Sequence, residues 1–303
     1  MNDVTRKIVM GAGLATVVLT GAHLAVQPNT AAGQSADRAA LLASERNDLA
    51  LQRVPAFRAF DNLYYVGVEW VGAWLVTTDD GLILLDAVDR PAHVDHLLNG
   101  IRRMGFDPRN LRYVIITHAD PDHYAGAARL QREFGARVAM SEADWLLVEA
   151  LSAETDGAAR PEAPRRDLVL QDGEKLTLGM TSLRFWSTPG HTPGAMSVDF
   201  TVFDHGQPYR AFLFGGGSAI DDVPTVERLL MGVENVERLQ DGVQVRVVSH
   251  PGTDPQFWER RDRLLTRRPA QANPMVDGDG FRMWIQALKA SARRYLDLAQ
   301  AGG

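Results

Sequence analysis

The sequence has no cysteine among its 303 residues. This absence excludes disulfide bonds, thiolate nucleophiles and cysteine ligands to a metal. Any metal must therefore be held by histidine and carboxylate side chains. The chain also lacks an excess of basic residues, because 32 Lys and Arg stand against 38 Asp and Glu and the net charge is −6. A nucleic-acid-binding surface calls for a basic face, so we expect no nucleic-acid partner.

Residues 1–32 have the layout of a secretory signal peptide. Arg6 and Lys7 precede an apolar stretch, "IVMGAGLATVVLTGAHLAV", that contains no Asp, Glu, Lys or Arg. The small residues of "NTAAG" follow and place a cleavage point near Ala32 or Gly33. We expect a periplasmic or secreted protein with no stable membrane association after cleavage. An uncleaved membrane anchor is the alternative, because the apolar run is just about long enough to span a bilayer.

The rest of the chain divides into a lead-in, residues 33–54, and one α/β domain, residues 55–303. The lead-in is polar and Ala-rich, and we expect it to be loosely held with a short helix. Strands are predicted in "LYYVGV", "AWLVTT", "GLILLDA", "LRYVIITH" and "ARVAMS", and in the segments from "DLVLQDG" to "VQVRVVSH". Helices are predicted over residues 91–104, 121–134, 142–151, 223–239, 256–266 and 280–299. Runs of strands interspersed with helices predict two sheets with helices outside them.

Four of the eight histidines end a predicted strand or follow one closely: His118, His123, His191 and His250. Loops at strand ends are where a sheet presents functional groups. Two acids, Asp120 and Asp122, accompany the first two histidines in "IITHADPDHYAG". Neutral imidazole and carboxylate oxygen are ligands that suit zinc, so the pattern predicts a zinc site.

The other four histidines are not expected to bind a metal. His23 lies in the targeting segment, and His205 lies in the turn "FDHGQ". His93 and His96 are expected on a solvated face of the predicted helix over residues 91–104, where most histidines bind nothing.

Several separate motifs carry a family resemblance. "THADPDH" resembles the HxHxDH signature of the metallo-β-lactamase superfamily, and "STPGHTPG" and "SHPG" match that family's later histidine motifs in order and rough spacing. The stretches "VPAFRAFDNLYYVGV", "GLILLDA", "QREFGARVAMSEADW" and "ANPMVD" are similar to the third subclass of metallo-β-lactamases. The resemblance covers most of residues 54–300. It implies a four-layer αββα sandwich with two zinc sites at one edge of the two sheets.

The resemblance also implies a ligand set for each zinc. One zinc would be held by His118, Asp120 and His191, and the other by Asp122, His123 and His250. The third subclass uses only histidine and aspartate in this second site, where the first subclass has a cysteine, so the missing cysteines agree with the resemblance. Asp122 would also act in catalysis, by orienting the attacking water.

Asp120 stands where the signature has its second histidine, and two interpretations stay open. Asp120 followed by Pro121 is a favoured helix start, in which an N-cap contributes roughly 1 kcal/mol. On that interpretation this zinc has only His118 and His191 as ligands and binds weakly. Alternatively, the carboxylate replaces an imidazole on zinc and completes a site of two histidines and one carboxylate.

The segment "FLFGGGSAI" is a second departure from the family. Many hydrolases of the superfamily carry an aspartate here that bridges both metals, whereas this chain has glycines. Ser218 resembles a serine that the third subclass uses near its second metal and the substrate carboxylate, but a further serine two positions on is Ile220 here. Tyr124 and Trp70 are further candidates for substrate binding beside the opening, with packing as the alternative role, and residues 152–166 are a candidate rim or lid.

These observations lead to a hypothesis about function. We expect a zinc-dependent hydrolase of small molecules, which opens the amide of β-lactam antibiotics by attack of a zinc-bound hydroxide. One alternative is an exported hydrolase of the same fold that acts on lactones or other esters. Another is a catalytically weak metal-binding homologue, which Asp120 and the glycines of "GGGS" support. The sequence does not indicate the oligomeric state.

Overall fold

The computed structural model describes residue 46 and residues 48–154, 160–217 and 222–301. Residues 44–303 form one compact unit. The expected signal peptide, residues 1–32, lies outside the described residues, and so does Ser218. Within the described ranges, no helix has both the length and the apolar composition needed to cross a membrane.

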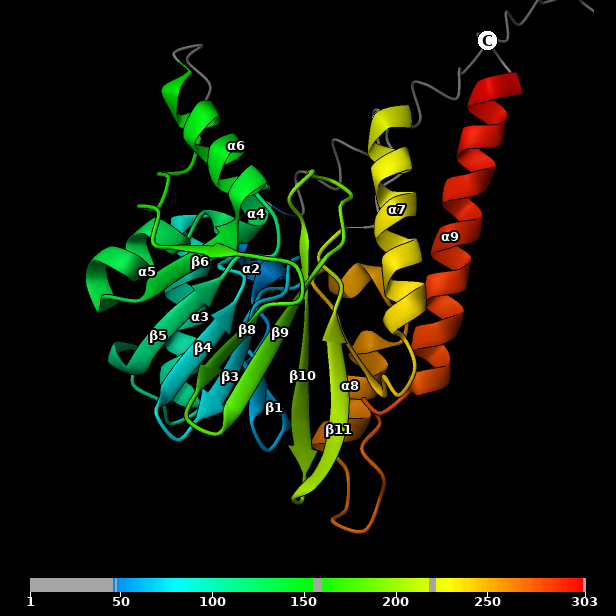
Figure 1. Cartoon of the computed structure of the whole chain (residues 1–303). Helices are drawn as coiled ribbons and strands as arrows, with labels where there is room; N and C mark the ends of the chain where they lie inside the picture. Colours follow the sequence, from blue (N-terminus) through cyan, green and yellow to red (C-terminus); the bar gives the residue numbers. More distant parts are fainter. Residues whose placement is uncertain (1–45, 47, 155–159, 218–221, 302–303) are drawn as a thin grey trace, which may run out of the picture. The chain divides into compact units, whose positions relative to one another are not determined.

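The described residues contain two β-sheets (Figure 1). One sheet follows the chain order and consists of β1 Phe57–Phe60, β2 Leu63–Tyr65, β3 Trp74–Thr78, β4 Gly81–Leu85, β5 Leu111–Ile115, β6 Arg137–Ser141 and β7 Leu168–Leu170. The other has the order β12 Val245–Val247, β11 Gln207–Leu213, β10 Met196–Asp204, β9 Thr181–Ser187 and β8 Lys175–Leu178. The pairs β4–β5, β5–β6, β6–β7 and β11–β12 are parallel.

Helices cover the outer faces of both sheets (Figure 1). The described helices are α2 Leu49–Gln52, α3 Pro91–Arg103, α4 Pro121–Tyr124, α5 Ala127–Phe134, α6 Glu142–Ala153, α7 Val223–Leu239, α8 Phe257–Leu265 and α9 Gly278–Ala301, with 3-10 turns at Pro108–Asn110 and Pro251–Thr253. Helices α3, α5 and α6 lie against the first sheet, and α7 and α9 lie side by side against the second.

Three hydrophobic clusters show how the layers are held together. Strand β4 alternates between two of them: Ile83 and Leu85 face the second sheet, whereas Leu82 and Leu84 face the helices. On the second sheet, Phe212 packs against α7 and α9 in the third cluster. Because side chains alternate between the faces of a strand, a strand buried on both faces is apolar throughout. Helix, sheet, sheet and helix thus form the predicted four-layer αββα sandwich, which is confirmed.

Two details differ from the sequence-based expectations. Strand β1 was not among the predicted strands. It pairs with β2 in a register that is irregular between Arg58 and Phe60. The single helix expected over residues 121–134 is broken into α4 and α5 at Gly126, whose N–H donates to the carbonyl of Ala87. A Cβ at Gly126 would lie 2.3 Å from that oxygen, so the close approach of the β4–α3 loop accounts for the break.

The last part of the expected lead-in is packed against the domain. Gln52 and Val54 are buried. The carbonyl of Gln52 accepts a hydrogen bond from the backbone N–H of Glu69, and its side chain accepts one from the N–H of Trp70. These bonds tie α2 to the loop between β2 and β3, so this part of the lead-in belongs to the folded unit.

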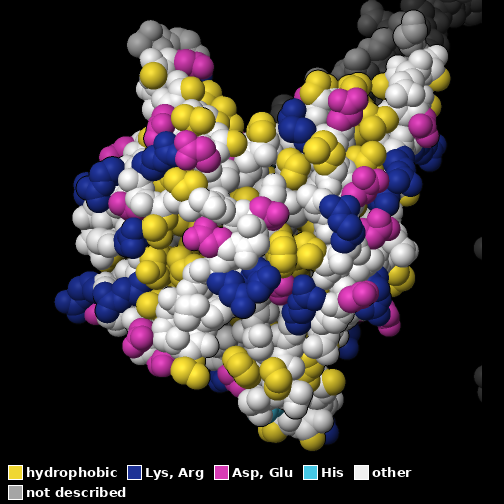
Figure 2. All heavy atoms as spheres, in the orientation of Figure 1, with side chains coloured by type: hydrophobic (Ala, Val, Ile, Leu, Met, Phe, Trp, Pro, Cys, Tyr) yellow, Lys and Arg dark blue, Asp and Glu magenta, His cyan; other side chains and the backbone are white. Residues whose placement is uncertain are grey.

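Charge is distributed evenly on the face drawn in Figure 2, where Lys and Arg alternate with Asp and Glu and no broad patch has one sign. Very little histidine is visible on this face, in keeping with the burial of His93, His118 and His123.

Candidate metal centre

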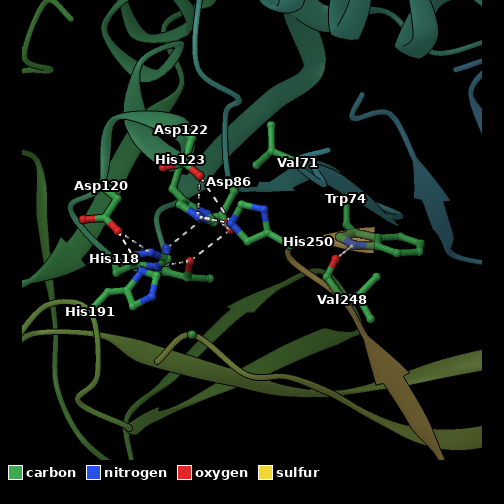
Figure 3. A network of polar contacts seen from close by, with 12 residues as sticks. Val71, Trp74, Asp86, His118, Asp120, Asp122, His123, His191, Val248 and His250 are labelled. Carbon is green, nitrogen blue, oxygen red and sulfur yellow. Dashed lines mark hydrogen bonds and ion pairs between the residues drawn. The ribbon is translucent and has the colours of Figure 1, made fainter. Parts of the chain in front are cut away.

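The six predicted ligand residues lie together in two groups of three (Figure 3). Group 1 consists of His118, Asp120 and His191, and group 2 consists of Asp122, His123 and His250. Within each group, one ligand atom from every residue lies within 4.8 Å of the others. The rings of His118 and His123 are 3.9 Å apart between centroids, so the two groups adjoin.

The ligand residues follow strands of both sheets. His118 and Asp120 lie between β5 and α4, and Asp122 and His123 lie on α4 itself. His191 lies in the loop between β9 and β10, and His250 follows β12. Residues far apart in the chain therefore meet at one edge of the sandwich, as the positions at strand ends predicted.

The three ligand atoms of group 2 form a nearly equilateral triangle. Nε2 of His123 is 3.2 Å from Nε2 of His250. Oδ2 of Asp122 is 3.4 Å from the first nitrogen and 3.3 Å from the second. A tetrahedral metal with bonds of about 2.0–2.1 Å separates its ligands by about 3.3 Å. The spacing of group 2 therefore fits a tetrahedral cation.

Hydrogen bonds on the far side of each ring set the direction of the group 2 histidines. Nδ1 of His123 lies 2.9 Å from Oδ2 of Asp86, and Nδ1 of His250 lies 2.9 Å from the carbonyl oxygen of Trp70. An acceptor at Nδ1 fixes the proton there in a neutral imidazole and leaves Nε2 as the ligand atom. Two such lone pairs at 3.2 Å from each other require a cation between them or a proton on one ring.

Asp86 supports group 2, and the sequence-based reasoning missed it. Its buried carboxylate accepts bonds from the N–H and the hydroxyl of Thr117, at 2.8 and 3.0 Å, in addition to contacting His123. Asp86 has a φ of 59° and Val88 has a φ of 54°. Left-handed backbone at a non-glycine residue costs on the order of 1–3 kcal/mol and concentrates at functional loops. The signal in the sequence was an acid at the end of the apolar run "GLILLDA".

The carboxylate of Asp120 points into group 1. Asp120 occupies the N-cap position of α4, but its side chain makes no capping hydrogen bond. Instead, Oδ2 lies 2.9 Å from Nδ1 of His191 and 3.2 Å from Nε2 of His118. The helix-cap interpretation of this side chain is therefore wrong, because both contacts are with histidines of the same group.

The surroundings of Nε2 of His118 are evidence for a cation site in group 1. This nitrogen is buried and, although it lies 3.2 Å from the carboxylate of Asp120, it makes no hydrogen bond. Its other ring nitrogen, Nδ1, lies 3.1 Å from the hydroxyl of Thr117. A buried nitrogen without a partner is costly, and a metal bound beside Asp120 would satisfy it.

The pKa values of His118, Asp120 and Asp122 suit metal ligands. Burial, together with the nearby charge of His123, lowers the pKa of His118 to about 4, so it is neutral at pH 7. Burial alone would raise the pKa of Asp120 and of Asp122, but their histidine neighbours outweigh it and hold both pKa values well below the usual range. Burial would lower the pKa of His123, but the carboxylates of Asp122 and Asp86 outweigh it and raise that pKa. The raised pKa favours a proton on His123, which a bound metal would have to displace.

Asp144 holds together the two loops that carry the ligands of group 1. Its buried carboxylate accepts hydrogen bonds from the N–H of Ala119, the hydroxyl of Thr192 and the N–H of Gly194, at 3.1, 2.9 and 3.2 Å. Burial raises the pKa of Asp144 to about 6. Sequence-based reasoning missed this residue as well, because its partners lie 25 to 50 positions away.

The predicted substrate-binding residues differ in where they lie relative to the two groups. The ring of Trp70 is half-buried and lies 5.4 Å from that of His250, beside group 2. Tyr124 is only 1% exposed and packs in the cluster between the first sheet and its helices, so it does not flank an opening and has the alternative packing role. Ser218 and residues 155–159 of the expected rim lie outside the described residues.

One expectation about the other histidines was wrong. His93 is 2% exposed and contacts Asp89 through Nδ1, so it does not lie on a solvated face. Nε2 of His96 lies 2.8 Å from the carbonyl of Val54, and His205 lies in a turn with a φ of 51°. These three histidines belong to neither group.

A family assignment follows from this fold and site. Residues 71–202 match the Metallo-beta-lactamase superfamily. The chain therefore carries a domain of the metallo-β-lactamase superfamily. More particularly, its structural neighbours are metallo-β-lactamases of subclass B3, the third subclass, as the sequence motifs implied.

Two solved structures resemble the domain over nearly their whole length. The native FEZ-1 metallo-β-lactamase from Legionella gormanii is 25% identical, with a TM-score of 0.73, over 82% of this chain and 98% of that chain. BJP-1, a subclass B3 metallo-β-lactamase of Bradyrhizobium japonicum, is 23% identical, with a TM-score of 0.71, over 83% of this chain and 97% of that one. At this identity the second likeness concerns the fold alone.

A curated relative is similar over a shorter stretch. A hydroxyacylglutathione hydrolase from Acidiphilium cryptum is 34% identical over 128 residues, which are 42% of this chain and 44% of that protein. The chain thus matches less than half the length of this relative.

Proposed function

We propose that this protein is a zinc-dependent hydrolase that opens the amide bond of β-lactam antibiotics. The observation that carries the proposal is the pair of adjoining His–Asp groups, with the equilateral spacing of group 2, in a domain whose structural neighbours are subclass B3 metallo-β-lactamases. Two adjacent metal sites suit an attack on a carbonyl and the stabilisation of a leaving group.

The residues present fit a metal, and each has a part in the chemistry. His118, Asp120 and His191 would hold one metal, and Asp122, His123 and His250 would hold the other. A bound zinc supplies a Lewis acid and makes a water more acidic. Because its pKa lies far below the usual range, Asp122 stays a carboxylate at neutral pH, and it accepts a hydrogen bond from the attacking water and orients it. Asp86 and the carbonyl of Trp70 keep Nε2 of the two group 2 histidines directed at the site.

A second candidate is a hydrolase that acts on thioesters, lactones or other esters. The name of the curated relative, hydroxyacylglutathione hydrolase, favours it. The segment 215–217 argues against it, because many hydrolases of the superfamily carry a bridging aspartate there. A Cβ at Gly216 would lie 2.7 Å from the carbonyl of Thr188, and one at Gly217 would lie 2.7 Å from the ring of His191. The His191 loop therefore occupies the space that a side chain in this segment would need.

The test compares substrates on protein of known metal content. Purified protein loaded with zinc would be assayed with a carbapenem, a cephalosporin, a glutathione thioester and a lactone, with zinc measured in the same sample. We expect turnover of a β-lactam. Turnover of the thioester or lactone without any β-lactam turnover at full zinc loading would contradict the proposal and favour the second candidate. No turnover of any substrate would indicate a catalytically weak homologue.

We also propose that the protein is exported through residues 1–32 and acts in the periplasm or outside the cell. The layout of charged, apolar and small residues in this segment supports the proposal. N-terminal sequencing of the protein from a periplasmic fraction would test it, with a start near Gly33 expected. An intact Met1 in the cytoplasmic fraction alone would contradict it.

A further inference from the structure

Residues 248–250, which follow β12, are hydrogen-bonded to β3 and to the loop between β2 and β3. Nε1 of Trp74 on β3 donates to the carbonyl of Val248 at 2.8 Å (Figure 3). Nδ1 of His250 donates to the carbonyl of Trp70 in the loop at 2.9 Å, and the rings of these two residues are 5.4 Å apart between centroids. The β2–β3 loop therefore contacts a ligand residue of group 2 directly.

The lead-in holds the tip of the same loop. The N–H of Val68 donates to the carbonyl of Val71 at 2.9 Å and closes the loop tip. Glu69 and Trp70 lie within this closure, and their N–H groups both donate to Gln52. The N–H of Glu69 bonds to the main-chain carbonyl of Gln52 at 3.0 Å, and that of Trp70 bonds to its side-chain Oε1 at 3.1 Å. One residue of the lead-in thus accepts a bond from each residue at the tip.

The side chain of Gln52 is placed to fix this loop. Gln52 is only 4% exposed, and its Oε1 bonds to the main chain of Trp70. The guanidinium carbon of Arg46 lies 4.4 Å from the centroid of the Trp70 ring, so the lead-in contacts the ring as well as the main chain. A main-chain N–H that loses its acceptor away from water is costly. Without Oε1 the loop tip would have to move, and the carbonyl that holds His250 would move with it.

We propose that Gln52 is a positioning residue for His250 and acts through Trp70. The partner of a histidine's remote nitrogen orients the ring of a metal ligand, and Gln52 fixes the residue that supplies this partner. Asp86, the corresponding partner of His123, is held in a similar way by hydrogen bonds from Thr117. This inference rests on the proposed zinc-dependent function and makes the lead-in a part of the support of group 2.

The experiment removes the acceptor and then restores it. Gln52→Met keeps an unbranched side chain of similar size but has no oxygen, whereas Gln52→Glu keeps an oxygen in the place of Oε1 in either protonation state. Gln131→Met is the matched control, because Oε1 of Gln131 also accepts from a main-chain N–H, that of Arg165 at 2.9 Å, but neither residue lies on an element that carries a group 2 ligand. Zinc affinities would be measured by competition with a chromophoric chelator. Asp122→Asn, which removes a candidate group 2 ligand, identifies the zinc that belongs to this group.

We expect Gln52→Met to bind the group 2 zinc about tenfold more weakly, at the lower end of the effects of residues that support a histidine ligand. Its affinity for the group 1 zinc should change less than about threefold, and Gln52→Glu and Gln131→Met should bind both zincs within about threefold of the wild type. Unchanged group 2 affinity in Gln52→Met, an equal loss from both groups, or an equal loss in Gln52→Glu or Gln131→Met would overturn the inference. If Gln52→Met does not fold, Gln52→Asn is measured instead. Its amide is too short to reach the N–H of Trp70, so the same loss is expected, and its absence would be decisive.

A spectroscopic measurement reports the position of His250 itself and needs no turnover. The ring N–H of His250 is bonded to the carbonyl of Trp70, so its NMR signal, assigned by its loss in His250→Gln, should exchange slowly with water in the zinc-loaded protein. We expect this exchange to be on the order of tenfold faster in Gln52→Met, and an unchanged rate would also overturn the inference.

The two measurements separate this inference from the proposed function. If no β-lactam is hydrolysed but Gln52→Met shows the selective loss of zinc affinity and the faster exchange, the proposed function fails and the positioning role stands. If β-lactams are hydrolysed but Gln52→Met matches the wild type in zinc affinity and exchange, the positioning role fails alone.

Discussion

The two candidate metal groups contain the same kinds of ligand, two histidines and one aspartate, but they are built differently. In group 2 the three ligand atoms are 3.2, 3.3 and 3.4 Å apart, and each histidine has its remote nitrogen held by an acceptor from another loop. In group 1, Oδ2 of Asp120 lies only 2.9 Å from Nδ1 of His191, close enough for a hydrogen bond. Ligand identity alone therefore does not make two sites equivalent.

The difference predicts an order of metal affinity. Loss of a residue that hydrogen-bonds the remote nitrogen of a histidine ligand commonly lowers metal affinity 10–100-fold. Both group 2 histidines have such a partner. In group 1, a metal must first break the contact between Asp120 and His191. We infer that group 2 holds its metal more tightly and that group 1 is the first to lose it.

The largest expected effect comes from matched substitutions in the two groups. Asp122→Asn and Asp120→Asn make the same chemical change, because each replaces the carboxylate of a candidate ligand with an amide, which is a poor ligand. We expect Asp122→Asn to lower kcat on the order of 10³-fold, because both a metal ligand and the group that orients the water are lost. The fall for Asp120→Asn should be smaller. Steady-state kinetics with zinc analysis would check this, and an equal fall in both variants would contradict the ranking of the groups.

The free energy of unfolding should depend on pH through Asp144, which holds the loops of group 1 together. Its pKa is raised to about 6 in the folded protein, against about 3.9 in an unfolded chain. The folded state therefore binds more protons than the unfolded state between about pH 4 and pH 6, so this residue's contribution to stability is present below pH 4 and is lost as pH rises through 6. The loss is about 3 kcal/mol for a shift of about two units.

Denaturant unfolding of the metal-free protein at several pH values would measure this loss. Asp144→Asn does not titrate, so the difference in unfolding free energy between wild type and variant should change from about pH 4 through pH 6 and level off above about pH 7. A constant difference from pH 4 to 7 would show that Asp144 is not the titrating group.

The fold was largely predictable because its signals are local. The bounds expected for α7 from periodicity, residues 223–239, are those found. The four candidate ligand histidines were also predictable from the sequence, because each follows a strand closely and the motifs resemble a known family. Neither conclusion required knowledge of which strands are neighbours.

The supporting residues were not predictable because their contacts are long-range. Asp86 meets His123 across 37 positions, and the direction of Asp120 depends on His191, 71 positions away. The sequence "DP" is a good helix start on local grounds, so local reasoning left the role of Asp120 open. His93 was misplaced for the same reason, since its neighbours on the helix are polar but Asp89 and the core enclose it.

Asp86→Asn should weaken metal binding in group 2 without removing a ligand. The amide cannot reproduce both the bonds from Thr117 and the contact with Nδ1 of His123. We expect a 10–100-fold loss of affinity for the tighter metal, measured by competition with a chromophoric chelator. Asp89→Asn is the control, because Asp89 contacts His93 and belongs to neither group. Equal losses in both variants would point to a general disturbance of the loop that carries both residues.

Asp120→His should reduce the difference in metal affinity between the two groups. This is the smallest of the expected effects. The side chain makes no capping bond that the substitution would break, so α4 should remain stable. An imidazole restores the three-histidine set of the family's signature, and we expect metal retention in group 1 to improve by about tenfold at a fixed chelator concentration. Asp120→Asn keeps the size of the side chain but offers a poor ligand, so it should lose the group 1 metal. If Asp120→Asn kept both metals during dialysis against the chelator, Asp120 would not be a ligand, and group 1 would depend on His118 and His191 alone.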